Sequence, residues 1–288
     1  MKRILCCLMA AALCVLAGCG STGTETNETG DKLLLATTKP VYELTQAVLG
    51  DTPGIQVELL IQEQVSCLHD YTITTGQMKK IEQAEAVILS GAGLEDFMAS
   101  SLSGKDQSAI IDSSDGIELL GDDPHIWLDP RRYAQQGLNI AKALGEKYPD
   151  YAADFTANAK AYTDDILAAY ENDWYPAAQS LSCKELVTFH DGFSYFADAY
   201  GLTILAAMEE EEGAEPSAAE LKEVMDLTRE HQLPMIFAEK NGATNAAEIV
   251  SQETGAKLGI LNLGMSSDSG DYKQVMDEDI SALKAGLQ

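Results

Sequence analysis

The chain has 288 residues, enough for two α/β domains or for one large one. Hydrophobic residues make up 45% of it and charged residues 23%, an ordinary mixture that predicts packed cores along most of the chain. Acidic residues outnumber basic ones by 46 to 19, and the net charge of −27 argues against binding nucleic acid or an anionic membrane surface through a basic patch.

The N-terminus predicts export. Residues 1–3 are Met-Lys-Arg, and residues 4–15 form an uncharged apolar run that is too short to span a bilayer comfortably. Residues 16–19 read Leu-Ala-Gly-Cys and resemble the lipobox of a bacterial lipoprotein signal. That resemblance implies a signal peptide over residues 1–18, a lipid on the Cys19 thiol, and a location on the extracytoplasmic face of the cell membrane. An ordinary secretory signal that is cut elsewhere is the alternative.

The mature chain keeps few features of a membrane or disulfide-rich protein. No second apolar run of spanning length follows the signal, so we expect no transmembrane helix. Of six cysteines, three leave with the signal peptide and Cys19 carries the lipid. The remaining two, Cys67 and Cys183, are too few for a disulfide framework and could pair with each other or stay free.

Strands and helices alternate in the first half of the mature chain. Residues 19–31 are rich in small and polar residues and predict a flexible tether. Residues 32–148 alternate short apolar strands with helices, which predicts an N-terminal α/β lobe around a parallel sheet. We place its strands at residues 33–36, 55–61, 86–89 and 109–112.

The middle of the chain is helical by pattern. A helix opens at Pro130, and a longer helical stretch follows Pro149. We predict one rigid connecting helix over residues 149–181, which Pro176 kinks or ends.

The alternating pattern resumes over residues 182–288 and predicts a C-terminal α/β lobe. A capping box at Ser217 and Glu220 predicts a helix up to His231, and residues 272–287 should be helical. The strands expected in this lobe are residues 185–189, 203–206, 235–238 and 257–261.

Three of the four histidines stand at strand ends or in loops. His69 lies in the loop after the second strand, His125 lies between two prolines, and His190 directly follows the first strand of the C-terminal lobe. Sheets of this kind bind ligands outside the carboxyl ends of their strands, and neutral imidazole is a good ligand for zinc. Any one of them is more simply a surface or hydrogen-bonded histidine, but three in such places predict a metal site assembled from distant segments. His231, at a helix end, is interpreted as structural or solvated.

The stretches around these histidines resemble the zinc/manganese solute-binding lipoproteins of ABC importers, the cluster A-I family of zinc-uptake and adhesin lipoproteins. The resemblance extends in order from about Lys32 to the C-terminus. It implies two parallel-sheet α/β lobes joined by one long rigid helix, a metal site in the cleft between the lobes, and metal ligands at His69, His125 and His190. The matching stretches are residues 69–71, 123–130, 189–196, 215–219 and 236–239.

The chain departs from the family where relatives place acidic ligands. Asn262 stands where many members have an Asp, and Leu68 stands where some zinc-type members have a Glu. Residues 116–123 are few and contain no histidine, so we expect no His-rich metal-scavenging loop. The fourth donor stays open between a water, Cys67, a carboxylate such as Glu211 in the four-Glu run, and Asn262.

Two further acidic residues adjoin the histidines. Asp70 and Asp191 directly follow His69 and His190 and could accept hydrogen bonds from the imidazoles. Adjacent side chains in a strand diverge, however, so this role is not assumed.

Three imidazoles without an obvious carboxylate favour zinc over manganese, which prefers oxygen ligands. We therefore expect an exported lipoprotein that captures zinc and delivers it to the permease and ATPase of an ABC importer, without catalysis. A manganese or iron receptor of the same family is the alternative. A zinc hydrolase would use a similar three-histidine geometry, but no His-Glu-x-x-His motif or general base beside the site favours it. A surface adhesin is a further alternative that no repeat, aromatic patch or basic stripe supports.

Overall fold

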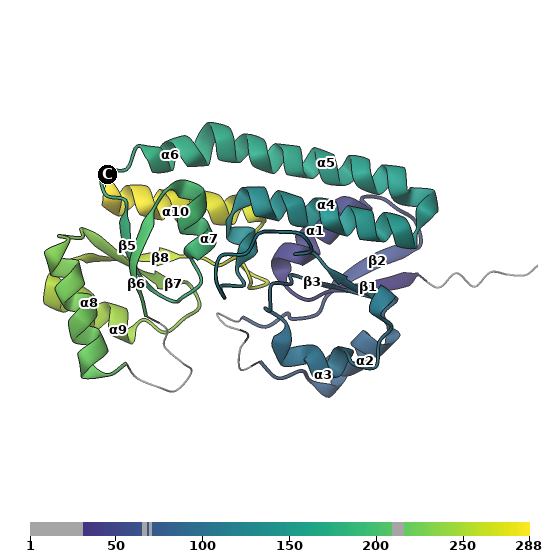
Figure 1. Cartoon of the computed structure of the whole chain (residues 1–288), viewed down its shortest axis with the longest axis horizontal. Coiled ribbons are helices and arrows are strands. Elements are labelled where there is room, and N and C mark those ends of the chain that lie inside the picture. Colours follow the sequence, from purple (N-terminus) through teal and green to yellow (C-terminus); the bar gives the residue numbers. More distant parts are fainter. Residues whose placement is uncertain (1–30, 65–67, 69–70, 209–215) are drawn as a thin grey trace, which may run out of the picture. The chain divides into compact units, whose positions relative to one another are not determined.

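Two four-stranded parallel sheets organise the computed structural model, which describes residues 31–64, 68, 71–208 and 216–288 (Figure 1). The first sheet has the order β2-β1-β3-β4 and is built from β1 (Lys32–Ala36), β2 (Ile55–Leu59), β3 (Ala86–Leu89) and β4 (Ile110–Asp112). The second has the order β6-β5-β7-β8 and is built from β5 (Glu185–Phe189), β6 (Thr203–Ala207), β7 (Met235–Glu239) and β8 (Lys257–Leu261). The predicted α/β class with two parallel sheets is confirmed.

Both sheets have the same topology, in which the first strand lies between the second and the third. All strand pairs are parallel, so the carboxyl ends of the strands share one edge in each sheet. The winding reverses between β1 and β3 and again between β5 and β7, which is where sheets of this type bind ligands. His190 follows β5 directly and therefore lies at such a point.

Continuous apolar runs form the central strands, because parallel sheets are covered on both faces. Leu34 and Leu35 of β1 and Val87 and Ile88 of β3 have no exposed surface. The helices α1 (Lys39–Leu49) and α2 (Thr75–Gln83) both pack against β1.

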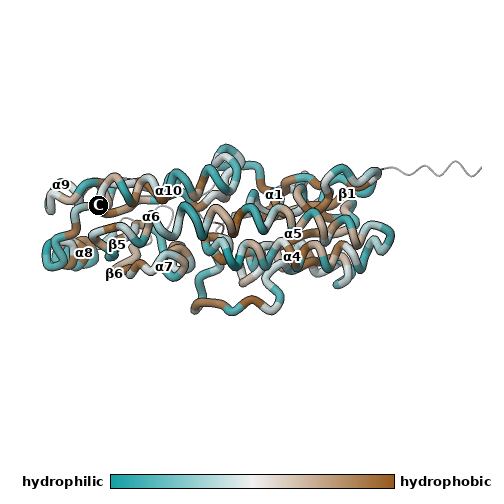
Figure 2. Tube along the Cα trace, turned by 90° about the horizontal axis from the view of Figure 1, so that it is seen from above, coloured by the Kyte–Doolittle hydropathy of each residue, from teal (hydrophilic) through white to brown (hydrophobic). Residues whose placement is uncertain are grey.

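The other helices alternate hydrophilic and hydrophobic residues, as the colours along α4 and α5 show in Figure 2. The predicted capping box is confirmed: Ser217 Oγ accepts from the Glu220 N–H, and the Glu220 carboxylate accepts from the Ser217 N–H. In the part of the chain that the structure describes, no helix is both long enough and apolar enough to cross a bilayer. The α-helices that follow α1 and α2 along the chain are α3 (Ala99–Leu102), α4 (Pro130–Lys147), α5 (Ala152–Ala169), α6 (Tyr175–Gln179), α7 (Ser194–Tyr200), α8 (Ala218–Glu230), α9 (Asn245–Thr254) and α10 (Tyr272–Leu287).

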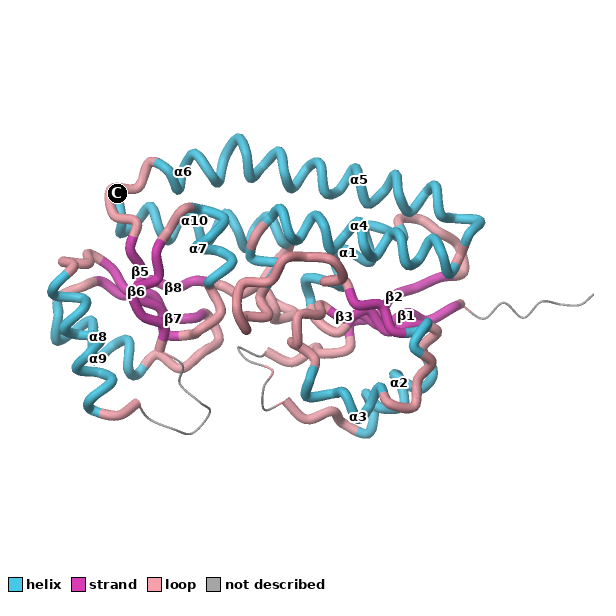
Figure 3. Tube along the Cα trace, viewed as in Figure 1, coloured by secondary structure: helices cyan, strands magenta, loops and turns pink. Residues whose placement is uncertain are grey.

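Helical backbone extends from Pro149 to Gln179 between the two sheets in sequence (Figure 3). A π-helical turn at Tyr170–Trp174 precedes Pro176, and the Tyr175 N–H donates to the carbonyl of Tyr170, five residues back. The wider turn accommodates a proline that has no N–H to donate, so the helix continues past Pro176 to Gln179. The predicted role of residues 149–181 as a rigid connector stays a prediction.

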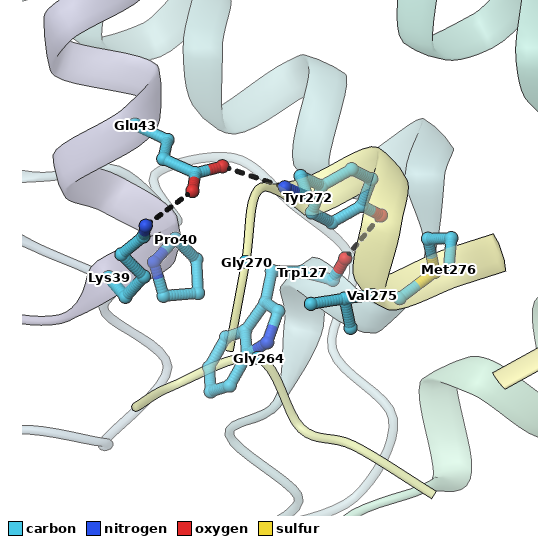
Figure 4. A pocket seen from close by; sticks show the side chains of 9 residues that line it. All are labelled: Lys39, Pro40, Glu43, Trp127, Gly264, Gly270, Tyr272, Val275 and Met276. Atoms are coloured by element: carbon cyan, nitrogen blue, oxygen red, sulfur yellow. Dashed lines mark hydrogen bonds and ion pairs between the residues drawn. The ribbon is translucent and has the colours of Figure 1, made fainter. Parts of the chain in front are cut away.

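A buried aromatic seam joins the 3-10 turn Ile126–Leu128 to α10 (Figure 4). The indole N–H of Trp127 donates to the carbonyl of Leu263 over 2.7 Å, and the Tyr272 hydroxyl donates to the carbonyl of Trp127 over 2.7 Å. The Tyr272 ring stacks on Tyr133 of α4 with ring centroids 3.8 Å apart. These contacts fix the backbone directly after His125 against a C-terminal element.

The same corner contains a partly buried ion pair. Glu43 of α1 lies 2.9 Å from the Lys39 ammonium and accepts from the Tyr272 N–H over 2.9 Å (Figure 4). Burial raises the pKa of Glu43, although Lys39 and the Tyr272 N–H act in the opposite direction. The hollow between these residues measures about 10 Å³, room for about one water molecule.

Candidate metal centre

The structure brings His125 and His190 together from distant segments. Their ring centroids lie 5.3 Å apart and the rings meet edge to face. His125 begins the 3-10 turn at Ile126, whereas His190 follows the carboxyl end of β5. Both side chains are buried, with His125 3% and His190 7% exposed.

Asp123 orients the His125 ring. One carboxylate oxygen, Oδ1, lies 2.7 Å from His125 Nδ1 and accepts from the His125 backbone N–H over 2.9 Å. An ionised carboxylate only accepts hydrogen bonds, which assigns the ring proton to Nδ1 and leaves the Nε2 lone pair available to a ligand. Burial acts to raise the pKa of Asp123, but hydrogen bonds from the ring and backbone of His125 and from the Ser194 N–H outweigh it and lower the pKa.

Gly192 packs against both imidazoles. A Cβ atom at this position would lie 2.7 Å from His190 Nε2 and 2.8 Å from His125 Cε1. Carbon atoms do not approach ring atoms so closely without displacing them. Close packing around the two rings therefore requires glycine at this position. Because Gly192 has no side chain, both rings can lie against the backbone there.

Several predicted site residues lie outside the described residues. They are His69, Cys67, Glu211 of the four-Glu run, and the lipidation candidate Cys19. Within the described ranges, no group of three or more His, Cys, Asp or Glu side chains has the spacing to hold a metal ion. The structure therefore brings two of the three predicted histidines together and leaves the place of His69 a prediction.

Asn262, a candidate fourth donor, is engaged within its own loop. Its side-chain oxygen accepts from the Gly264 N–H over 2.9 Å and from the Ser269 hydroxyl over 3.3 Å. Its amide nitrogen lies 3.4 Å from Glu278 Oε2. Both lone pairs of the oxygen are occupied, so coordination of a metal by Asn262 would require one of these bonds to break.

The remaining predicted features make other contacts or are exposed. His231 pairs with Glu185 at 2.9 Å on the surface, which confirms its interpretation as a structural or solvated residue. Cys183 Sγ lies 3.6 Å from the carbonyl of Glu185. Asp191, which directly follows His190, is exposed.

Sequence reasoning did not single out Asp123 or Gly192, although both belong to the quoted motifs. The available signal was local: an Asp two residues before a histidine can reach back to its ring, and a glycine two residues after one allows close approach of the backbone. The path of the backbone decides which of the neighbouring acidic residues contacts the histidine ring.

The fold and these paired rings define a two-sheet α/β binding protein that assembles its site from well-separated segments. The chain belongs to the family of zinc-uptake complex component A, periplasmic, whose model matches residues 34–286. This match confirms the resemblance drawn from the motifs.

Individual relatives are similar over most of the chain. The high-affinity zinc uptake system protein ZnuA of Bacillus subtilis is 28% identical over 97% of this chain and 96% of its own length. The zinc-binding lipoprotein AdcA of Streptococcus pneumoniae is 30% identical over 99% of this chain, which spans 61% of that relative. The Zn(II)-bound ZnuA-like domain of S. pneumoniae AdcA has a TM-score of 0.77 at 29% identity, covering 90% of this chain and 99% of that one.

Proposed function

We propose that this protein is the metal-capturing component of an ABC importer, that zinc is its cargo, and that His69, His125 and His190 are ligands. The observation that carries the proposal is the buried pair of His125 and His190, with the His125 ring oriented by a carboxylate. Orienting a ligating histidine through its second ring nitrogen is what metal sites require. Family membership and the names of the relatives support zinc as the cargo.

The chemistry of the described donors also favours zinc. Two imidazoles lie together, and the Asp123 carboxylate that contacts the His125 ring is already occupied by hydrogen bonds. Manganese sites are richer in oxygen ligands, so this donor set suits zinc better. The fourth donor is proposed to be a water or one of Cys67 and Glu211, with Asn262 less suited because its oxygen is occupied.

The role is capture and delivery without catalysis. The partners proposed on the basis of the family are a membrane permease and its ATPase. A lipid on Cys19 would keep the protein at the extracytoplasmic face of the membrane, a proposal supported by the lipobox and by the lipoprotein name of one relative.

The site is tested by metal analysis of the soluble protein, residues 20–288, before and after chelation. We expect about one zinc per chain, and loss of zinc from the His69→Ala, His125→Ala and His190→Ala triple variant. His231→Ala is the matched control, because this histidine pairs with Glu185 on the surface. Full zinc binding by the triple variant would overturn the ligand assignment.

The choice of cargo needs a separate test. When the protein is incubated with both metals, we expect it to retain zinc even when manganese is in large excess. Displacement of zinc by equimolar manganese would instead identify a manganese receptor. Transport is tested by growth of a deletion strain, which zinc alone should restore.

A further inference from the structure

The carboxylate of Asp123 makes hydrogen bonds in two directions. Oδ1 binds the ring and backbone of His125, whereas Oδ2 accepts from the Ser194 N–H over 3.0 Å. Ser194 begins α7, four residues after His190. We propose that Asp123 is a positioning residue that holds His125 and the His190 segment in one geometry for metal capture. This inference rests on the proposed function.

The first part of the argument is the state of the His125 ring. With Nδ1–H directed at Asp123, the lone pair must be on Nε2, the only ring atom left to bind a metal. The Asp123 side chain is 6% exposed and that of His125 is 4% exposed, so water does not readily replace this bond. Asp123 therefore selects the tautomer of His125 before the metal arrives.

The second part is the link to the other histidine. The segment that precedes and follows His125 is held to α7 at further points. The Leu120 N–H donates to the Tyr195 hydroxyl over 2.8 Å, and Arg132 pairs with Asp198 at 2.9 Å. Among these links, only the one through Asp123 also contacts a histidine ring. A shift of α7 would therefore be transmitted to the His125 ring through this carboxylate.

The third part is that the position requires a carboxylate. Three donors converge on Asp123: the His125 ring N–H, the His125 backbone N–H and the Ser194 backbone N–H. An asparagine has the same shape, but its NH₂ group would face one of these donors whichever way it turned. In Asp123→Asn, either the Ser194 link is lost or the His125 ring can no longer donate from Nδ1 to this side chain.

The experiment compares zinc dissociation constants, measured by competition with a chromophoric chelator, for four proteins: wild type, Asp123→Asn, Asp122→Asn and His125→Ala. We expect Asp123→Asn to weaken zinc binding about 10- to 100-fold, the usual effect of removing a partner of a ligating histidine. Asp122→Asn is the matched control, because Asp122 is exposed and the change is the same. It should stay within about twofold of wild type.

Nuclear magnetic resonance of the metal-free protein supplies a readout that a merely structural role would not move. Wild-type His125 should show protonated Nδ1 and unprotonated Nε2, and the Ser194 amide proton should be shifted downfield by its bond to a carboxylate. In Asp123→Asn at least one of these signatures should disappear. Because the wild-type spectrum needs no variant, the test holds even if Asp123→Asn folds poorly.

The outcomes separate the two proposals. Zinc binding lost in His125→Ala but unchanged in Asp123→Asn would overturn the positioning role and leave the proposed function intact. A wild-type His125 protonated on Nε2 in the metal-free protein would overturn the positioning role as well. Zinc binding unchanged in His125→Ala would overturn the site on which the inference rests.

Discussion

The imidazole rings of His125 and His190 meet edge to face with their centroids 5.3 Å apart. His125 comes after the last strand of the first sheet in the chain, whereas His190 directly follows β5 of the second sheet. Neither segment creates this pairing alone. Asp123 and Gly192 surround the pair, one through hydrogen bonds and the other through close packing. Four predictions concern this packing and the stability of the surrounding fold.

Gly192→Ala should weaken zinc binding by about 10- to 100-fold, a range typical of changes beside metal ligands. The added methyl group would lie under 3 Å from both rings and must displace at least one of them. Chelator competition measures the effect. Gly104→Ala is the matched control, since nothing lies within 4 Å of a Cβ at that position. Equal zinc affinity for the two variants would show that the rings tolerate the methyl group.

Tyr272→Phe should lower the free energy of unfolding by about 1–2 kcal/mol. The change removes the hydroxyl that donates to the buried Trp127 carbonyl and leaves that carbonyl without this partner. Urea unfolding followed by tryptophan fluorescence measures it. Tyr175→Phe, at a position 41% exposed, should change stability by less than about 0.5 kcal/mol. Wild-type stability of Tyr272→Phe would show that the Tyr272 hydroxyl does not stabilise the seam.

Asp129→Ala should destabilise the protein by about 2 kcal/mol or more, because it removes a helix cap and a buried charge partner together. Asp129 accepts from the Arg131 N–H at the start of α4 and binds the guanidinium groups of Arg131 and Arg132. Its side chain is 1% exposed. Asp198→Ala removes a 46% exposed partner of the same arginines and should cost less than about 1 kcal/mol. Thermal unfolding of the two metal-free variants measures both losses of stability. Equal losses would show that the buried position of Asp129 does not matter.

Glu95→Gln should change the pH dependence of stability. Burial raises the pKa of Glu95 from about 4.5 to about 7, although hydrogen bonds from Thr37, Ser90 and Gly91 act in the opposite direction. Between these values the folded state holds a proton that the unfolded state has lost, so stability falls as pH rises from about 4.5 to about 7. This one group contributes a slope of about −1.4 kcal/mol per pH unit.

Urea unfolding of metal-free wild type and Glu95→Gln at pH 5, 6, 7 and 8 measures that slope. The difference in free energy between the two proteins should change between pH 5 and pH 7 and then level off. Asp106→Asn, at an exposed position, is the control and should reproduce the wild-type slope over the same pH range. Parallel curves for wild type and Glu95→Gln would show that Glu95 is ionised throughout this range.

Much of the fold was predictable because the signals are local. Apolar runs such as residues 33–36 and 185–189 form central strands, since a parallel sheet buries both faces of such a strand. Ser217 and Glu220 cap α8 through bonds between residues three apart. The π turn before Pro176 was not predictable in this way, since the missing N–H of the proline is visible in the sequence but the wider turn that accommodates it is not.

By itself the sequence determined the class of the fold, the family and the histidines to examine, because strand patterning and motifs depend on residues that are close along the chain. Only the tertiary structure decided which neighbours serve those histidines. Asp191, adjacent to His190, is exposed, whereas Asp123 binds the Ser194 N–H of the His190 segment. Asn262 accepts a hydrogen bond from Gly264 of its own loop. The reason is geometric: side-chain direction at a strand end is set by the turn of the backbone and by packing against residues many positions away.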